Sequence, residues 1–313
     1  MLRTAINLAT AFALAGTLIA PAAIAQEAPR DAEIAPEFRL KGDVVSILFV
    51  MVREFPFVEA EVNGVKGKLL LDTGALEALS LNHNPLKLPE GRVLRRGNFA
   101  SGQSFEIILR PSVDDVRLAG GPAYGRVTTV RSQDAAQLER ITPDFLGWLG
   151  HWFWEGYAAK FDYKASKATF YKGEPKAFLK GETVVAAIPF ETRNRPNVPI
   201  LTARIGDMDF ETLLDTGQYG NIYADAATLQ HLSAIGAIKP AAEGAFDIRA
   251  VRFSKGPAIP MAKLGSHPIE GAAPFAKAIG VSSPRILSLG YAFLRQYKTV
   301  WDYSNRTLYL LKP

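Results

Sequence analysis

Two Asp-Thr-Gly segments are the residues of this chain best suited to chemistry. Asp72–Gly74 and Asp215–Gly217 each follow an apolar run of leucines. A hydrophobic run that ends in a carboxylate and a glycine is typical of a buried strand that turns sharply and leaves the carboxyl group at its end. If two such carboxylates meet, they cannot both ionise near neutrality and must share a proton. The ionised member can then activate a water while the protonated member polarises a carbonyl, which is the chemistry of peptide hydrolysis.

The spacing of the two segments indicates a duplicated domain. Asp72 and Asp215 are separated by 143 residues, and Phe161–Tyr163 matches Trp301–Tyr303 at an offset of 140. A repeat of this length is too long for a solenoid unit and fits a small domain. We therefore expect two lobes that pack around a pseudo-twofold axis, each supplying one aspartate to a shared site.

Short apolar segments punctuated by Gly, Asn and Asp predict a mostly β chain with short helices. Residues 224–235 have helical spacing, and a stretch rich in Lys, Gly, Glu and Pro at 171–183 marks the connection between lobes. We place the N-terminal lobe at residues 44–173 and the C-terminal lobe at 174–313. The strands expected in the first lobe are 44–52, 57–62, 68–71, 105–109, 126–130 and 158–163.

The N-terminus has the pattern of an export signal. Arg3 precedes an apolar stretch at 5–20 and a small-residue site at Ala23–Ala25, so we expect a signal peptide at residues 1–25 that is cleaved after Ala25. An uncleaved membrane anchor is the alternative. Residues 26–43 are polar and acidic and are expected to form a flexible leader. The alanine-rich signal predicts a periplasmic or secreted bacterial protein.

Composition narrows the range of functions. The chain has no cysteine, which excludes disulfides and thiol chemistry. The formal net charge of +5 becomes +4 without Arg3, and the basic residues are scattered, so nucleic acid is not an expected partner. No later apolar stretch has the roughly 20 residues of a membrane helix, so no stable membrane insertion is expected after signal cleavage. The four histidines lack metal-ligand spacing, and neither metal nor cofactor is expected.

The sequence resembles the aspartic peptidases of the pepsin and retropepsin clan, specifically a bacterial retropepsin-like protein with two lobes in one chain. The resemblance covers nearly all of residues 44–313. It rests on the paired Leu-Leu-Asp-Thr-Gly motifs, on Gly147–Gly150 and Leu287–Gly290, and on the closing Asp-Tyr strands. It implies a mostly β, bilobal aspartic-protease-like fold with two retropepsin-like β-barrel lobes. It also implies a monomeric endopeptidase that binds an extended peptide or protein substrate between the lobes.

The resemblance assigns the catalytic roles to Asp72 and Asp215. The residues that it implies as support for the catalytic loops are Thr73, Gly74, Ala75, Thr216, Gly217 and Gln218. The threonines are expected to hydrogen-bond across the interface, and the glycines leave room for close approach. In the clan the hydrophobic-hydrophobic-Gly segment crosses beneath the catalytic loop.

The family also closes a β-hairpin flap over its substrate. The candidate flap tips, which are weak substrate-binding candidates, are Gly97–Ser104 with Phe99 and Gly102, and Glu243–Phe246 with Phe246.

Two residues depart from the pattern of secreted acid proteases. Ala75 and Gln218 stand where a serine or threonine hydroxyl usually donates to the aspartate. Loss of that donor predicts a higher working pH than pepsin's, with a rate that falls from pH 6 to pH 3. Gln218 and Tyr219 can either fill the substrate cleft or bind a peptide backbone.

Other interpretations of the paired motifs remain. The main alternative is a non-catalytic periplasmic peptide-binding or scaffold protein that retains the protease fold. A dimer with two dyads is less compatible with duplication inside one chain. A glycosidase also uses two carboxylates, but these lie some 5 to 9 Å apart and need no repeated turn.

Overall fold

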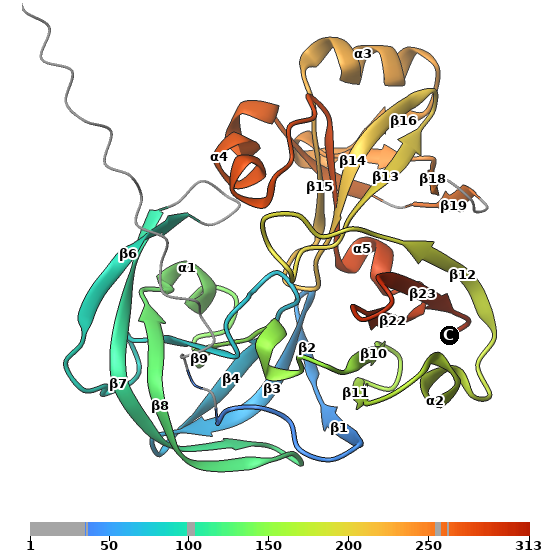
Figure 1. Ribbon diagram of the computed structural model, residues 1–313. Coiled ribbons are helices and arrows are strands. Elements are labelled where there is room, and N and C mark those ends of the chain that lie inside the picture. Colours follow the sequence, from blue (N-terminus) through green and yellow to red (C-terminus); the bar gives the residue numbers. More distant parts are fainter. Residues whose placement is uncertain (1–34, 36, 99–103, 254–257, 262) are drawn as a thin grey trace, which may run out of the picture. The chain divides into compact units, whose positions relative to one another are not determined.

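Two β lobes in the computed structural model match the duplication in the sequence (Figure 1). The structure describes residues 35, 37–98, 104–253, 258–261 and 263–313. These residues belong to one compact unit, Ala32–Pro313. The chain is mostly β with short helices, as the sequence predicts.

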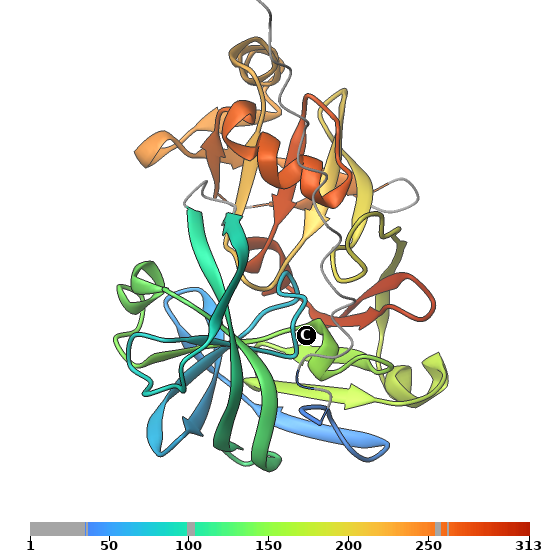
Figure 2. The same ribbon diagram turned by 60° about the vertical axis from the view of Figure 1, so that its left-hand side comes forward.

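The first lobe is an eight-stranded sheet in the order β2-β3-β4-β9-β5-β8-β7-β6, which curls so that β3 also pairs with β7. The antiparallel strands β6, β7 and β8 form one end of this sheet and can be followed in both views (Figures 1 and 2). The strands are β2 (Val50–Val52), β3 (Phe55–Val62), β4 (Val65–Leu71), β5 (Leu79–Asn82), β6 (Arg92–Asn98), β7 (Ser104–Leu118), β8 (Ala123–Gln133) and β9 (Phe145–Leu149).

The second lobe is a nine-stranded sheet in the order β16-β17-β20-β15-β21-β14-β13-β18-β19. Its strands are β13 (Ile200–Ile205), β14 (Met208–Leu214), β15 (Gly220–Tyr223), β16 (Ile238–Pro240), β17 (Phe246–Ile248), β18 (Ala250–Phe253), β19 (Ala258–Pro260), β20 (Lys263–His267) and β21 (Ile286–Leu289).

A six-stranded sheet in the order β1-β11-β10-β22-β23-β12 joins the lobes. Its strands are β1 (Val44–Leu48), β10 (Ala158–Asp162), β11 (Lys167–Tyr171), β12 (Val184–Pro189), β22 (Lys298–Asp302) and β23 (Thr307–Leu311). The lobes meet where β10 pairs antiparallel with β22, for example Lys160 with Val300. A backbone ladder therefore connects the two halves behind the site.

The α-helices among the described residues are short: α1 (Ala136–Glu139), α2 (Pro175–Leu179), α3 (Ala226–Ala234), α4 (Ile269–Ile279) and α5 (Tyr291–Leu294). Helix α3 confirms the helix expected at 224–235, and Asp225 caps it by accepting from Thr228 N–H at 2.7 Å. Helix α4 was not expected from the sequence. It carries an internal proline, Pro274, and ends at Gly280 in the left-handed conformation. None of the helices in the described part of the chain is long and apolar enough to cross a membrane.

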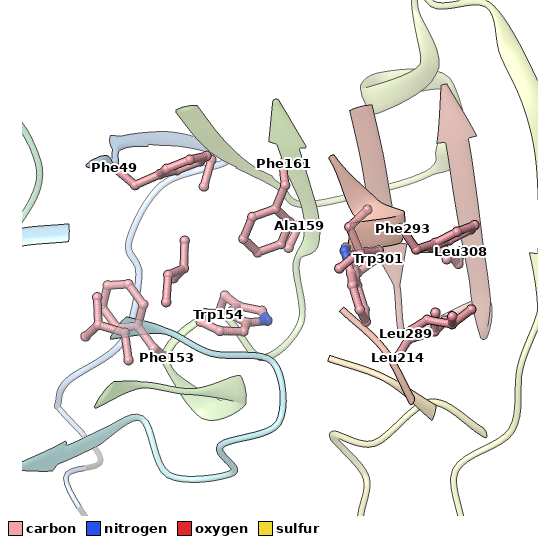
Figure 3. Packing of buried hydrophobic residues seen from close by; sticks show 14 of the residues in the cluster. Phe49, Phe153, Trp154, Ala159, Phe161, Leu214, Leu289, Phe293, Trp301 and Leu308 are labelled. Atoms are coloured by element: carbon pink, nitrogen blue, oxygen red, sulfur yellow. The ribbon is translucent and has the colours of Figure 1, made fainter. Parts of the chain in front are cut away.

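The main hydrophobic core runs through both lobes, because the six-stranded sheet contributes buried side chains from each. Figure 3 shows this junction, with Phe161 on β10 facing Trp301 on β22. Their ring centroids lie 6.3 Å apart with an edge-to-face geometry. Trp154 is fully buried in this core.

The segment before β1 differs from the flexible leader expected at 26–43. Phe38 and Leu40 are buried, and the Phe38 ring lies 4.4 Å from the Tyr124 ring. The Leu40 N–H donates to the Phe153 carbonyl at 3.0 Å. These apolar residues provide enough burial to order the end of the segment, which its polar composition concealed. Residues 1–34, which include the expected signal peptide, and residue 36 lie outside the described residues.

Candidate active site

The two aspartates sit at the ends of equivalent central strands. Asp72 follows β4, and its N–H donates to the Leu149 carbonyl at 2.9 Å; Asp215 follows β14, and its N–H donates to the Leu289 carbonyl at 3.0 Å. Strand β9 lies between β4 and β5, parallel to the first and antiparallel to the second. Strand β21 lies in the same way between β14 and β15. The Leu-Gly strands thus cross beneath the catalytic loops, as the resemblance implied.

Reciprocal hydrogen bonds between the threonines lock the two loops together. The Thr73 N–H donates to Thr216 Oγ1 at 3.0 Å, and the Thr216 N–H donates to Thr73 Oγ1 at 2.9 Å. Thr216 Oγ1 also donates to the Leu71 carbonyl at 2.8 Å. Both threonines are fully buried, so these bonds are shielded from water. They confirm the cross-interface bonding expected from the sequence.

Glycine is required where each loop approaches the opposite aspartate. A Cβ on Gly74 would lie 2.5 Å from Asp215 Oδ2, and a Cβ on Gly217 would overlap the Asp72 carboxyl. No side chain fits at such distances. The two carboxyls are therefore held face to face by backbone that only glycine permits.

The two carboxyls share a proton, and their hydrogen-bond partners differ. Burial, the Asp215 charge and a hydrogen bond with Asp215 raise the pKa of Asp72 well above its usual range, despite bonds from the Gly74 and Ala75 N–H groups. Burial also raises the pKa of Asp215, and bonds from Gly217, Asp72 and the Gln218 side chain oppose that rise. The side-chain donor at Asp215 therefore favours the charge on this member of the pair.

The Gln218 side chain supplies the hydrogen bond that a serine or threonine hydroxyl usually donates at this position. Its Nε2 donates to Asp215 Oδ2 at 3.1 Å, so Asp215 keeps a side-chain donor that the sequence had led us to consider absent. An amide on a longer side chain reaches the same oxygen. At Ala75 the prediction of a missing donor holds, because only its backbone N–H reaches Asp72 Oδ1, at 3.2 Å. Tyr219 packs against the core and does not line the cleft.

A brace behind the first loop was missed by sequence reasoning. The buried side chain of Asn197 donates from Nδ2 to the Thr73 carbonyl at 3.1 Å and to the Gly74 carbonyl at 2.8 Å. The Tyr303 hydroxyl in turn donates to the Asn197 carbonyl at 3.0 Å. Burial and the two aspartates raise the pKa of Tyr303, so it remains a neutral donor. One sequence signal is that Asn197 lies two residues before Pro199, which matches Pro56 at the same offset of 143 residues as the aspartates.

A cleft of about 470 Å³ opens above the dyad and is lined by both lobes. Its walls include Gly97, Phe105 and Ile107 from the β6–β7 hairpin on one side and Phe275 and Ile279 from α4 on the other. The hairpin and α4 approach each other in both views (Figures 1 and 2). The hairpin expected around Gly97–Ser104 is therefore present as β6 and β7.

The structure describes only one of the three candidate flap residues, Phe246. Phe99 and Gly102 lie outside the described residues. Phe246 lies in β17, packs against the main core and is not among the residues that line the cleft. Helix α4 takes the place expected for the flap of the second lobe, because it rather than β17 borders the cleft beside Asp215. A flap at Glu243–Phe246 stays a prediction.

Charged residues line one flank of the cleft. Arg131 on β8 is almost fully buried and forms an ion pair with Glu77, and the Arg95 Nη2 atom lies 3.9 Å from the same Glu77 oxygen. Arg195 and Arg96 also line the cleft. Arg95 and Arg96 are adjacent in the sequence, but nothing in the sequence alone linked Arg95 to Arg131 or Arg195.

No group of three or more acidic or histidine side chains within the described residues is arranged to hold a metal ion. His151 is buried against the Tyr303 ring, with centroids 4.5 Å apart. Burial and the Arg39 charge lower its pKa to about 4. It is therefore a neutral packing group beneath the first loop.

Comparison with known proteins supports the fold. The structure is similar to the crystal structure of basic 7S globulin from soybean, with a TM-score of 0.52 and 11% sequence identity over 86% of this chain and 94% of that chain. The chain thus has a pepsin-like, bilobal, aspartic-protease-like fold. At this identity the likeness concerns the fold alone. No protein-family model matches the sequence, and no curated protein matches it significantly.

Proposed function

We propose that this protein is an exported aspartic endopeptidase of the bacterial retropepsin-like type, acting as a monomer with Asp72 and Asp215 as its catalytic pair. The observation that carries the proposal is the buried carboxyl pair at the base of a two-walled cleft, with hydrogen bonds that favour a proton on Asp72 and a charge on Asp215. Two buried carboxyls facing each other cost stability in a purely structural role, because one must stay protonated.

The proposed reaction uses a water bound between the carboxyls. Asp215 accepts a proton from this water as it attacks the peptide carbonyl, and Asp72 gives its proton to the carbonyl oxygen. The resulting gem-diol collapses as the leaving nitrogen takes the proton from Asp215, and one diol hydroxyl returns a proton to Asp72. No covalent enzyme intermediate forms. The peptide lies extended between the β6–β7 hairpin and α4.

The direction of the pKa shifts predicts the working pH. The pair is active while it holds one proton, so the raised pKa of Asp72 extends activity upward toward neutrality. Protonation of Asp215 ends activity on the acid side. We expect the rate to fall between pH 6 and pH 3.

The alternative function is a non-catalytic periplasmic peptide-binding or scaffold protein. The observation that favours it is the Gln218 amide, which lines the cleft and occupies Asp215 Oδ2 at 3.1 Å. That oxygen is one that a nucleophilic water also needs. Binding of the inhibitor pepstatin without cleavage of any peptide would favour this function.

Cleavage of a peptide library by the mature protein between pH 3 and pH 8, beside Asp72→Asn and Asp215→Asn, tests the proposal. One shared dyad predicts that each variant alone loses cleavage by about 10³-fold or more, since residues that act as a unit are not additive. A wild-type protein that is folded by circular dichroism yet inert at every pH would contradict the enzyme proposal.

A further inference from the structure

Three guanidinium groups gather around a single carboxylate on the first-lobe flank of the cleft. Arg131 pairs with Glu77 at the floor, Arg95 reaches the same Glu77 oxygen at 3.9 Å, and Arg195 enters from the segment between β12 and β13. Within the described residues these four side chains carry three positive charges and one negative charge. The Glu77 side chain is 15% exposed and the Arg131 side chain 2% exposed, so this charge is poorly solvated at its base.

The cationic groups are close enough to affect one another. Burial and the Arg195 charge lower the pKa of Arg131 to about 10, and burial and the Arg95 charge lower the pKa of Arg195. All three stay protonated at neutral pH. Gathering like charges in a half-buried wall is unfavourable unless an anion joins them.

Arg195 is the group with capacity to receive that anion. No hydrogen bond or ion pair to its guanidinium occurs within the part of the chain that the structure describes, although its side chain is half-buried in the cleft wall. Arg95 is 36% exposed and touches Glu77 only at the limit of an ion pair. A guanidinium presents parallel N–H donors that match a carboxylate.

Among the described residues, the Arg131–Glu77 pair at the base of the cluster has no counterpart in the second lobe. Ser80 on β5 lies opposite Arg131 on β8, and the equivalent pair in the second lobe is Asn221 opposite Gly265. Glu77 follows Asp72 by five residues in the same loop, so the cluster flanks the dyad directly. A general role in the shared fold would not require this asymmetry.

We propose that Arg95 and Arg195, supported by the Arg131–Glu77 pair, form a carboxylate-binding subsite that selects peptides with an acidic group beside the reacting bond. The proposal assigns a substrate class to the proposed peptidase. It rests on that proposed function, because it treats the bound peptide as a substrate. The carboxylate comes either from an internal Asp or Glu side chain or from a peptide C-terminus. Arg195 and Arg95 are specificity residues that contact the ligand, whereas Arg131 positions Glu77.

Binding to catalytically silenced Asp72→Asn protein tests the subsite separately from turnover. The probes are fluorescein-labelled decapeptide pools in which one position at a time is Glu or Gln, each pool with a free or an amidated C-terminus, measured by fluorescence anisotropy. We expect about 10- to 100-fold tighter binding with Glu at one position, the range for a charge-assisted pair, and weakening of this preference in added salt.

Arg195→Met and Arg95→Met in the same background keep the apolar stem and remove the charge. Each should cut the Glu-over-Gln preference at least several-fold. The matched control is Arg117→Gln, which removes one charge from an exposed position on β7 outside the cleft. Arg131 is left intact because its removal would strand the buried Glu77 charge.

The outcomes separate the two proposals. Preference for internal Glu, or only for the free C-terminus, supports the subsite and identifies the source of the carboxylate. Equal binding of all pools, whether Glu or Gln and whether free or amidated at the C-terminus, a preference unchanged in Arg195→Met, or no binding of any pool overturns it. Acid-selective binding with no cleavage by the wild type keeps the subsite and overturns the peptidase function.

Discussion

Asp72 and Asp215 hold equivalent places in the two lobes, yet their surroundings differ. Each carboxyl accepts a 2.7 Å hydrogen bond from the glycine N–H two residues on. Asp215 has a side-chain donor, Gln218, whereas at Ala75 only a backbone N–H is available. Duplication alone would give two identical carboxyls. The difference in donors therefore favours the charge on Asp215.

The first catalytic loop is also longer and more heavily supported. Leu79 and Gly220 each pair with the equivalent leucines Leu149 and Leu289, so the first loop has two more residues between its aspartate and the next strand. Glu77 lies in this longer loop and bonds to the arginine cluster. The repeat thus preserves the chemistry, while the departures from it add selectivity and support.

The largest effect is expected where the two loops are alike, at the glycine of each loop that approaches the opposite aspartate. Gly74→Ala and Gly217→Ala should each reduce the cleavage rate by about 10²-fold or more, because the added methyl group displaces the opposite carboxyl. Steady-state kinetics at the optimal pH measures the effect. Gly156→Ala, at a left-handed position with no atom near its Cβ, controls for backbone strain and should lower stability without affecting the rate comparably. If either cleft variant kept normal activity, the close contact of the loops would not be needed for catalysis.

The shared features explain how much of this site can be predicted from sequence. Asp72, Thr73 and Gly74 form a contiguous motif that occurs again at Asp215, so the sequence alone was enough to pair the two motifs. The mostly β class and helix α3 followed from local periodicity.

Asn197 and the arginines required knowledge of the folded chain. Asn197 reaches the first loop across 124 residues of sequence, and Arg131 reaches Glu77 across a parallel strand pairing. Helix α4 was concealed by Pro274, which is unfavourable inside a helix. Tertiary contacts rather than local pattern select these residues.

The next effect tests the support given to one loop only. Asn197→Ala removes two hydrogen bonds to the first loop and should lower kcat by about 10- to 100-fold with little change in KM, and lower the free energy of unfolding by about 1–3 kcal/mol. The matched variant is Glu54→Ala, at the equivalent position of the first lobe, where no hydrogen bond to the second loop occurs among the described residues. Equal losses in both variants would contradict an asymmetric brace.

A smaller effect concerns the pH profile. Gln218→Leu removes a donor to ionised Asp215, which raises the pKa of Asp215 and should reduce the rate at pH 4 by about 3- to 10-fold relative to the optimum. Ala75→Ser adds a hydroxyl beside Asp72, which lowers its pKa and should move the alkaline limit of activity downward. Gln218→Leu thus raises the acid limit of activity, and Ala75→Ser lowers the alkaline limit. Unchanged limits in kcat/KM between pH 3 and pH 9 would show that these donors do not set the charge of the pair.

The smallest expected effect is on stability. Because the folded protein raises the pKa of Asp72, this group contributes stability that is fully present below the unfolded pKa of about 3.9 and is lost as the pH rises through the folded pKa. Asp72→Asn removes the titration, so the variant should melt about 2–4 °C above the wild type at pH 8, a change that corresponds to roughly 1 kcal/mol. The difference should shrink toward pH 4. Asp215→Asn should gain less, because hydrogen bonds from Gly217 and Gln218 already stabilise the Asp215 charge. Thermal melts by circular dichroism from pH 4 to pH 8 measure both, and a gain in Asp72→Asn that did not vary with pH would place its origin in packing rather than in the shared proton.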